Sequence, residues 1–331
     1  MTVAAALVLA LVGAGPAANH HADPAGRIVC RIHDPRITEA SSLVDLGRWM
    51  VTADDSGSGP VLYLLDARTG RTVGTTTYAD AVTDVEALAP AGHREVWVGD
   101  IGDNTRSRPA VSVYRAPVGP GHRTVRAPRF DLTYPDGSHD AEALVADRGR
   151  LFVVTKAFLG AAVYNAPRQL STTHPNRMRR VADAPPIVTD AALLPDHRHA
   201  LLRNYAEATV VTFPGMRRVG SFPLPRERQG EAVSVGRQGR VRVTSEGTHP
   251  AVISVAPPPR MRAAFRPHAT ADHPRASPSK GTAPSRQADK PGKPAPHGSP
   301  WPLIGLGVVV VAAAYGLRRL RRRLVRRDRE R

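Results

Sequence analysis

Acidic residues recur in this sequence in similar short contexts, and residues of this type could hold a metal ion or move protons. The contexts are "ITEASSL", "VTDVEAL", "HDAEAL" and "RQGEAVSV", which contain Glu39, Glu86, Glu142 and Glu231. A related copy, "VTDAALL", keeps Asp190 but has Ala192 where the glutamate would stand. Carboxylate oxygens are the ligands that hard divalent cations prefer. If the fold gathers these copies, their carboxylates could form a metal centre.

A second polar residue follows most of the glutamates about 14 positions later, at the end of the next β-rich stretch. Glu86 leads to Asp100, Glu142 leads to Lys156, and Glu231 leads to Ser245 and its neighbour Glu246. Glu39 leads to Asp54 and Asp55 after 15 to 16 residues. The copy without a glutamate offers a cation and a phenol instead, Arg203 and Tyr205.

This charged set has two interpretations. In the first, each acid caps backbone amides in the turn of its own repeat, because buried carboxylates must find hydrogen-bond donors. In the second, carboxylates and the "GDIGDN" stretch bind a divalent cation, with calcium as the cofactor, through Glu86, Asp100, Asp103, Asn104 and Glu142. An anionic ligand would then contact Lys156, Arg203, Tyr205, Asp190 and Glu231.

The spacing of the copies predicts the elements that carry them. Equivalent positions lie 39 to 56 residues apart, and each interval contains alternating apolar stretches separated by turn residues. Such a recurrence is typical of a four-stranded unit repeated around an axis. The sequence therefore predicts an all-β fold, a β-propeller of five blades. Six blades remain an alternative if the long interval from Glu86 to Glu142 hides two short ones.

The last repeat lacks a fourth strand, and a lone strand at the start of the folded region could supply it. Residues 27–34, "RIVCRIHD", place Ile28, Cys30 and Ile32 on one face. Pairing this strand into the last blade would close the ring and remove an open edge. We expect Cys30, the chain's one cysteine, to be a small buried side chain.

The remaining segments predict export and anchoring. Residues 1–18 resemble a signal peptide, residues 27–256 form the propeller, and residues 257–300 are a proline-rich disordered linker. Residues 301–317 are long enough for a transmembrane helix, and the arginine-rich tail, residues 318–331, would be cytoplasmic. We therefore expect a single-pass protein of the cell membrane with its propeller outside.

The net charge of +17 does not indicate a nucleic-acid partner. The linker and the tail together carry +13 of it, whereas residues 27–256 carry only +5. A nucleic-acid-binding surface would need the excess on the folded domain. The partners expected are the membrane and an extracellular protein, a cell-wall component or a small anionic ligand.

The stretches "ITEASSL", "GDIGDN", "YPDGSHDAEALVAD", "LFVVTK" and "QGEAVSV" resemble those of exported actinobacterial propeller proteins of unknown function, described as WD40-like or phytase-esterase-like. The resemblance covers residues 27–256 and implies the propeller fold without an activity. Two functions stay open. One is a membrane-tethered binding or scaffold module with a charged channel mouth. The other is a metal-dependent hydrolase of a phosphate ester, a lactone or a similar anionic substrate.

Overall fold

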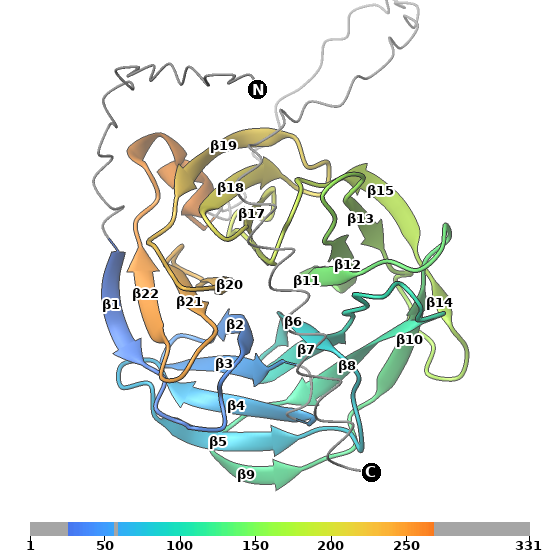
Figure 1. Cartoon of the computed structure of the whole chain (residues 1–331), viewed down its shortest axis with the longest axis horizontal. Coiled ribbons are helices and arrows are strands. Elements are labelled where there is room, and N and C mark those ends of the chain that lie inside the picture. Colours follow the sequence, from blue (N-terminus) through green and yellow to red (C-terminus); the bar gives the residue numbers. More distant parts are fainter. Residues whose placement is uncertain (1–25, 56–58, 268–331) are drawn as a thin grey trace, which may run out of the picture.

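The chain folds as a β-propeller in a computed structural model that describes residues 26–55 and 59–267. Within these residues, 22 strands form five sheets arranged around a central axis (Figure 1). The prediction of five blades is confirmed, and the alternative of six blades is wrong.

The first two blades are each built from an antiparallel meander that starts beside the axis. The strands of blade 1 are β2 (Ala40–Asp45), β3 (Trp49–Asp54), β4 (Val61–Asp66) and β5 (Thr72–Thr77). Those of blade 2 are β6 (Val85–Gly92), β7 (Glu95–Asp100), β8 (Val111–Pro117) and β10 (Arg129–Thr133).

Two short strands extend these blades, and the first of them lies within the long interval from Glu86 to Glu142. The connection from β8 to β10 contains β9 (Gly121–Thr124), which pairs in parallel with β5 of blade 1. A second addition, β14 (Asn176–Arg177), comes from blade 3 and pairs in parallel with β10. The extra residues therefore tie neighbouring blades together and do not form a sixth blade.

The other three blades follow the same plan. Blade 3 holds β11 (Ala141–Asp147), β12 (Arg150–Thr155), β13 (Ala162–Asn165) and β15 (Arg179–Asp183). Blade 4 holds β16 (Asp190–Leu193), β17 (His199–Arg203), β18 (Glu207–Thr212) and β19 (Arg218–Pro223). Blade 5 holds β20 (Gly230–Val235), β21 (Val241–Ser245), β22 (Ala251–Val255) and β1 (Gly26–Arg31).

The strand β1 closes the ring, as the sequence predicts, by pairing antiparallel with β22. The expectation that Ile28, Cys30 and Ile32 share one face is wrong. The register shifts between Ile28 and Cys30, and this bulge leaves Ile28 51% exposed while Cys30 and Ile32 are buried. A bulge inserts one residue and so reverses the alternation beyond it. The thiol of Cys30 is free and buried.

The hydrophobic cores lie between blades. Among the described residues, each of five clusters joins the facing sides of two neighbouring blades. Between blades 1 and 2, for example, Val51 and Leu64 pack with Val96 and Val98. Alternate residues of one strand therefore serve two different cores, because strand side chains point to opposite faces.

The folded region extends beyond the boundary predicted at residue 256. A 3-10 helix, η1 (Pro259–Phe265), buries Met261 and Phe265 in the core between blades 4 and 5. Within residues 26–55 and 59–267, no helix has the length and apolar character needed to cross a membrane. The predicted signal peptide, transmembrane segment and basic tail, residues 1–18, 301–317 and 318–331, lie outside the described residues.

Candidate metal centre

The recurring glutamates mark β-bulges at the start of the innermost strands, which lie next to one another around the axis (Figure 1). The register against the second strand shifts at Glu86 in β6, at Glu142 in β11 and at Glu231 in β20. A bulge leaves one residue out of the ladder and redirects its side chain. All three carboxylates are buried. We call this end of the axis the mouth.

The mouth lacks a glutamate in two blades. In blade 1 the register shift falls at Ser41, whose hydroxyl donates to the carbonyl oxygen of Val85 at 3.2 Å. The predicted equivalent, Glu39, lies two residues earlier and is half-buried. In blade 4, whose strands are fully described, the pairing of β16 with β17 continues in register from Asp190 to Leu193. The acids of the five sequence copies therefore do not form a complete ring at the mouth.

In four blades, the residue one or two positions after the second strand sets the charge that the blade presents at the mouth. Backbone hydrogen bonds place Asp55, Gly102, Lys156 and Glu246 at equivalent positions, because each amide donates to the residue two before the bulged one. Around the ring this position thus changes from an acid to a glycine, a lysine and another acid. The sequence spacing indicates Asp55, Lys156 and Glu246 at or beside this position, but it indicates Asp100 where the structure has Gly102.

Three carboxylates from blades 1 and 2 converge. One oxygen each of Asp55, Asp84 and Glu86 lies within 4.8 Å of the others, and all three residues are at most 2% exposed. Two oxygens on opposite sides of a calcium ion are about 5 Å apart, because Ca–O distances are about 2.3 to 2.6 Å. The donors are all oxygens, which suits a hard cation. Burial raises the pKa of Glu86 well above its ordinary value, and the charges of Glu142 and Asp84 raise it further.

Gly102 makes room for this group. A Cβ atom at Gly102 would lie 2.5 Å from Cγ of Asp84 and 2.9 Å from Cγ of Glu86. The amide of Gly102 also donates to the carbonyl oxygen of Asp84 at 3.1 Å. Gly102, the second glycine of "GDIGDN", is therefore the residue of that stretch that the acidic group needs most directly.

The other acids of the same stretch have local partners. Asp100 accepts hydrogen bonds from the amides of Thr83 and Asp84 and lies 3.0 Å from the guanidinium of Arg108. It thereby fixes the backbone of Asp84. Asp103 accepts hydrogen bonds from the amides of Ser107 and Arg108, and the side chain of Asn104 is exposed. The structure does not bring Asp103 and Asn104 into the converging group.

Lys156 is the cation of the mouth. Its Nζ lies 2.9 Å from Oε1 of Glu142 and 5.5 Å from the centre of the Tyr205 ring. Burial lowers the pKa of Lys156, but the charges of Glu142 and Glu231 outweigh this effect and raise it well above its ordinary value. The ammonium is therefore charged. Glu231 accepts one hydrogen bond from Gln229, at Oε1, and its Oε2 is buried without a hydrogen-bond partner in the described structure.

The predicted ligand-binding residues Asp190 and Arg203 hold blades 4 and 5 together. Asp190 accepts a 2.7 Å hydrogen bond from the amide of Val233 in blade 5. Arg203 is 1% exposed, donates to the carbonyl oxygen of Ala232 at 2.9 Å and pairs with Glu227 at 3.0 Å. Both side chains are thus occupied by contacts between blades, whereas Tyr205 and Glu231 lie beside Lys156.

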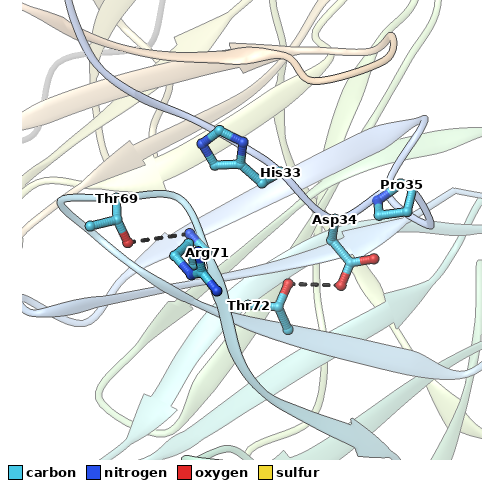
Figure 2. Close-up of a pocket in the computed structure, with 6 residues that line it drawn as sticks. All are labelled: His33, Asp34, Pro35, Thr69, Arg71 and Thr72. Atoms are coloured by element: carbon cyan, nitrogen blue, oxygen red, sulfur yellow. Dashed lines mark hydrogen bonds between the residues drawn. The ribbon is translucent and has the colours of Figure 1, made fainter.

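A cavity of about 480 Å³ lies away from the mouth, between the segment after β1 and the β4–β5 turn (Figure 2). Its acid, Asp34, accepts hydrogen bonds from Arg36 and from the hydroxyl of Thr72. The hydrogen bonds from Arg36 lower the pKa of Asp34 to about 2, against the opposing effect of burial. In this cavity the negative charge of Asp34 is compensated by Arg36. No other carboxylate belongs to its described lining residues.

Comparison with known proteins finds only distant structural similarity. The sequence matches no known family and no curated protein. A solved structure of Myxococcus xanthus glutaminyl cyclase is similar with a TM-score of 0.43 and 12% identity, over 70% of this chain and 100% of the cyclase. A gluconolactonase of Xanthomonas campestris gives a TM-score of 0.40 and 15% identity, over 65% of this chain and 70% of the enzyme. Kuenenia stuttgartiensis hydrazine synthase gives 0.36 and 12%, over 63% and 56%. These solved structures are only distantly similar to the five-bladed β-propeller that this chain forms.

Proposed function

We propose that the mouth binds a divalent cation, for which calcium is the best candidate, and that the cation and Lys156 together bind an anionic ligand. The observation that carries this proposal is the convergence of Asp55, Asp84 and Glu86, with one oxygen of each inside 4.8 Å and all three side chains buried.

The charge balance of the mouth supports the cation. Lys156 forms an ion pair with Glu142 there. The described residues of the mouth include six buried carboxylates: Asp55, Asp84, Glu86, Asp140, Glu142 and Glu231. Carboxylates whose oxygens lie within 4.8 Å of one another, as in Asp55, Asp84 and Glu86, repel strongly in a medium of low dielectric constant. A divalent cation would relieve this repulsion and allow the carboxylates to remain ionised.

The ligand would approach beside Lys156. The side chain of Lys156 is 20% exposed, so its ammonium can contact both Glu142 and an incoming anionic group. The adjoining β12–β13 segment exposes Phe158 and Leu159, which are 45% and 74% accessible. A ligand with an anionic group next to an apolar part would match this combination of side chains.

The sequence supports a proposal about the cellular setting of this domain. We propose that it belongs to the exported propeller group that its motifs resemble, with the domain held outside the membrane by residues 301–317. Protease added to intact cells should then remove the propeller and leave a small membrane-bound fragment that contains residues 301–331. Complete protection of the propeller would contradict the topology.

Hydrolysis is the second candidate function, because the carboxylates converge closely and lie near Lys156. A bound cation can polarise an ester or lactone and lower the pKa of a coordinated water. Lys156 would hold the anionic part of a phosphate ester, and Glu142 would orient the ammonium of Lys156. Calcium-dependent turnover of such a substrate, lost on replacing Asp84 and Glu86 by their amides, would favour this function over binding alone.

The cation is tested by thermal unfolding of residues 26–267, which contain all five blades and their cores. Calcium at about 100 times its dissociation constant should stabilise the domain by about 2.7 kcal/mol relative to EDTA. The double variant Asp84→Asn/Glu86→Gln should lose this response, and without calcium it should be at least as stable as the parent because the repulsion is smaller.

The matched control is Asp80→Asn, which removes a carboxylate that is 88% exposed and pairs with Arg126. It should keep the full response to calcium. An unchanged melting temperature of the parent domain across calcium, magnesium and EDTA would reject the proposed cation.

A further inference from the structure

A strongly basic cavity lies on blade 3, far from the mouth. It has a volume of about 270 Å³ and is lined by Arg150, Arg168, Arg177, Arg179 and Asn165. Glu142 begins β11 at the mouth, whereas Arg150 follows the far end of this strand, about 17 Å away at roughly 3.3 Å per residue. The cavity is therefore separate from the candidate metal centre.

Strand pairing brings these side chains together. Asn165, at the end of β13, pairs with Arg179 on one side and with Phe152 of β12 on the other. Arg177 and Arg179 flank Met178, which is buried in the core between blades 2 and 3. Because Met178 turns inward, its two neighbours remain exposed.

Nearby carboxylates are engaged elsewhere. Asp147 lies 2.8 Å from Nδ1 of His197, Asp183 pairs with Arg180, and Asp131 pairs with Arg129. In the described part of the chain, no ion pair joins any of the four cavity arginines to an acid; Arg150 instead lies over the ring of Phe152. Four guanidinium groups thus line one concavity without a counter-charge from the protein.

A guanidinium group can donate two parallel N–H hydrogen bonds to two oxygens of one phosphate group, and this geometry makes arginine well suited to bind phosphate. Asn165 lines the same cavity, and its Oδ1 is buried and makes no hydrogen bond in the described structure, so a ligand reaches this oxygen once the Asn165 side chain turns toward the cavity. A phosphate group supplies only acceptors at neutral pH, so it can occupy the arginines but cannot satisfy this oxygen. A hydroxyl group on the same ligand can.

We propose that this cavity binds a phosphate monoester whose carbon skeleton carries hydroxyl groups, such as a sugar phosphate. The arginines hold the phosphate, and Asn165 accepts a hydrogen bond from a hydroxyl. The small volume suits one phosphorylated sugar unit, either free or at the end of a larger molecule.

The test is calorimetric titration of the purified full-length chain at about 0.15 M salt, near physiological ionic strength, with glucose 6-phosphate, inorganic phosphate, sulfate and glucose. We expect glucose 6-phosphate to bind at least tenfold more tightly than phosphate or sulfate, and glucose to show no binding. Equal affinity for all three anions, or no binding of glucose 6-phosphate, would overturn the proposal.

Two variants and one control locate the site. Arg177→Gln/Arg179→Gln should weaken glucose 6-phosphate binding at least tenfold with an unchanged melting temperature, because both side chains are exposed. Asn165→Ala should reduce the preference for glucose 6-phosphate over phosphate and leave phosphate binding unchanged. Arg126→Gln removes an arginine that is 86% exposed elsewhere and should bind like the parent. Equal loss in this control would show that binding reflects net charge and would overturn the proposed site.

Discussion

Nζ of Lys156 lies 2.9 Å from Oε1 of Glu142, and the ring of Tyr205 covers the same ammonium at 5.5 Å from its centre. Glu142 begins the innermost strand of blade 3 and Lys156 follows the second strand, so one hairpin delivers both charges to the mouth. The pair gives blade 3 a cation at the position where blade 1 has Asp55.

Removing the ammonium group of Lys156 should destabilise the propeller. Lys156→Met leaves Glu142 buried without its partner and should lower the free energy of unfolding by about 2 to 3 kcal/mol, less than for a fully buried pair because Lys156 is partly exposed. Glu142→Gln/Lys156→Met should recover about 1 to 2 kcal/mol of that loss. Urea denaturation of both single variants and the double variant measures this coupling, and purely additive effects would contradict the pairing.

Adding one methyl group at Gly102 should disturb the acidic group. Gly102→Ala places Cβ 2.5 Å from Cγ of Asp84, which forces backbone or side-chain movement at a cost of about 1 to 3 kcal/mol. The calcium-induced rise in melting temperature should also shrink. Gly215→Ala is the matched control, because its Cβ meets only Oγ1 of Thr212, at 3.8 Å. Similar behaviour of the two variants would mean that Gly102 has no special role.

Closure of the ring by β1 and the residue after it, Ile32, should contribute strongly to the free energy of unfolding of the propeller. Ile32→Ala empties a site that is fully buried between blades 5 and 1 and should cost about 2 to 5 kcal/mol. Ile28→Ala, in the same segment but 51% exposed, should cost less than about 1 kcal/mol. Deleting residues 26–31 should abolish cooperative unfolding as followed by circular dichroism, and a shortened domain with an unchanged melting temperature would refute the closure.

Asp34 should contribute an acid-sensitive part of the stability. Its pKa is about 2 in the folded protein and 3.8 ordinarily, so the unfolded chain binds the proton more readily. The contribution is therefore complete above about pH 4 and disappears as the pH falls through about 2. Asp34→Asn should be less stable than the parent at pH 6 and should approach it near pH 2 in urea titrations. A difference that is constant with pH would contradict this assignment.

Local regularities made much of the fold predictable. Alternating strands, turn residues and copies of one motif depend on neighbouring positions in the chain, so they indicated five blades and the closing strand. The 14-residue step from Glu142 to Lys156 is also local, because one hairpin connects these residues. The bulged position carries an acid in three of the five blades, at Glu86, Glu142 and Glu231.

Other features depended on register and on contacts between blades. A shift of two residues preserves the strand period, so the pattern in "ITEASSL" could not distinguish Glu39 from Ser41 as the bulged residue. Asp55 and Asp84 come from different blades, and contacts with Val233, Ala232 and Glu227 occupy the side chains of Asp190 and Arg203. Sequence periodicity fixes which side of a strand a residue occupies, whereas the packing of one blade against the next decides which charges meet.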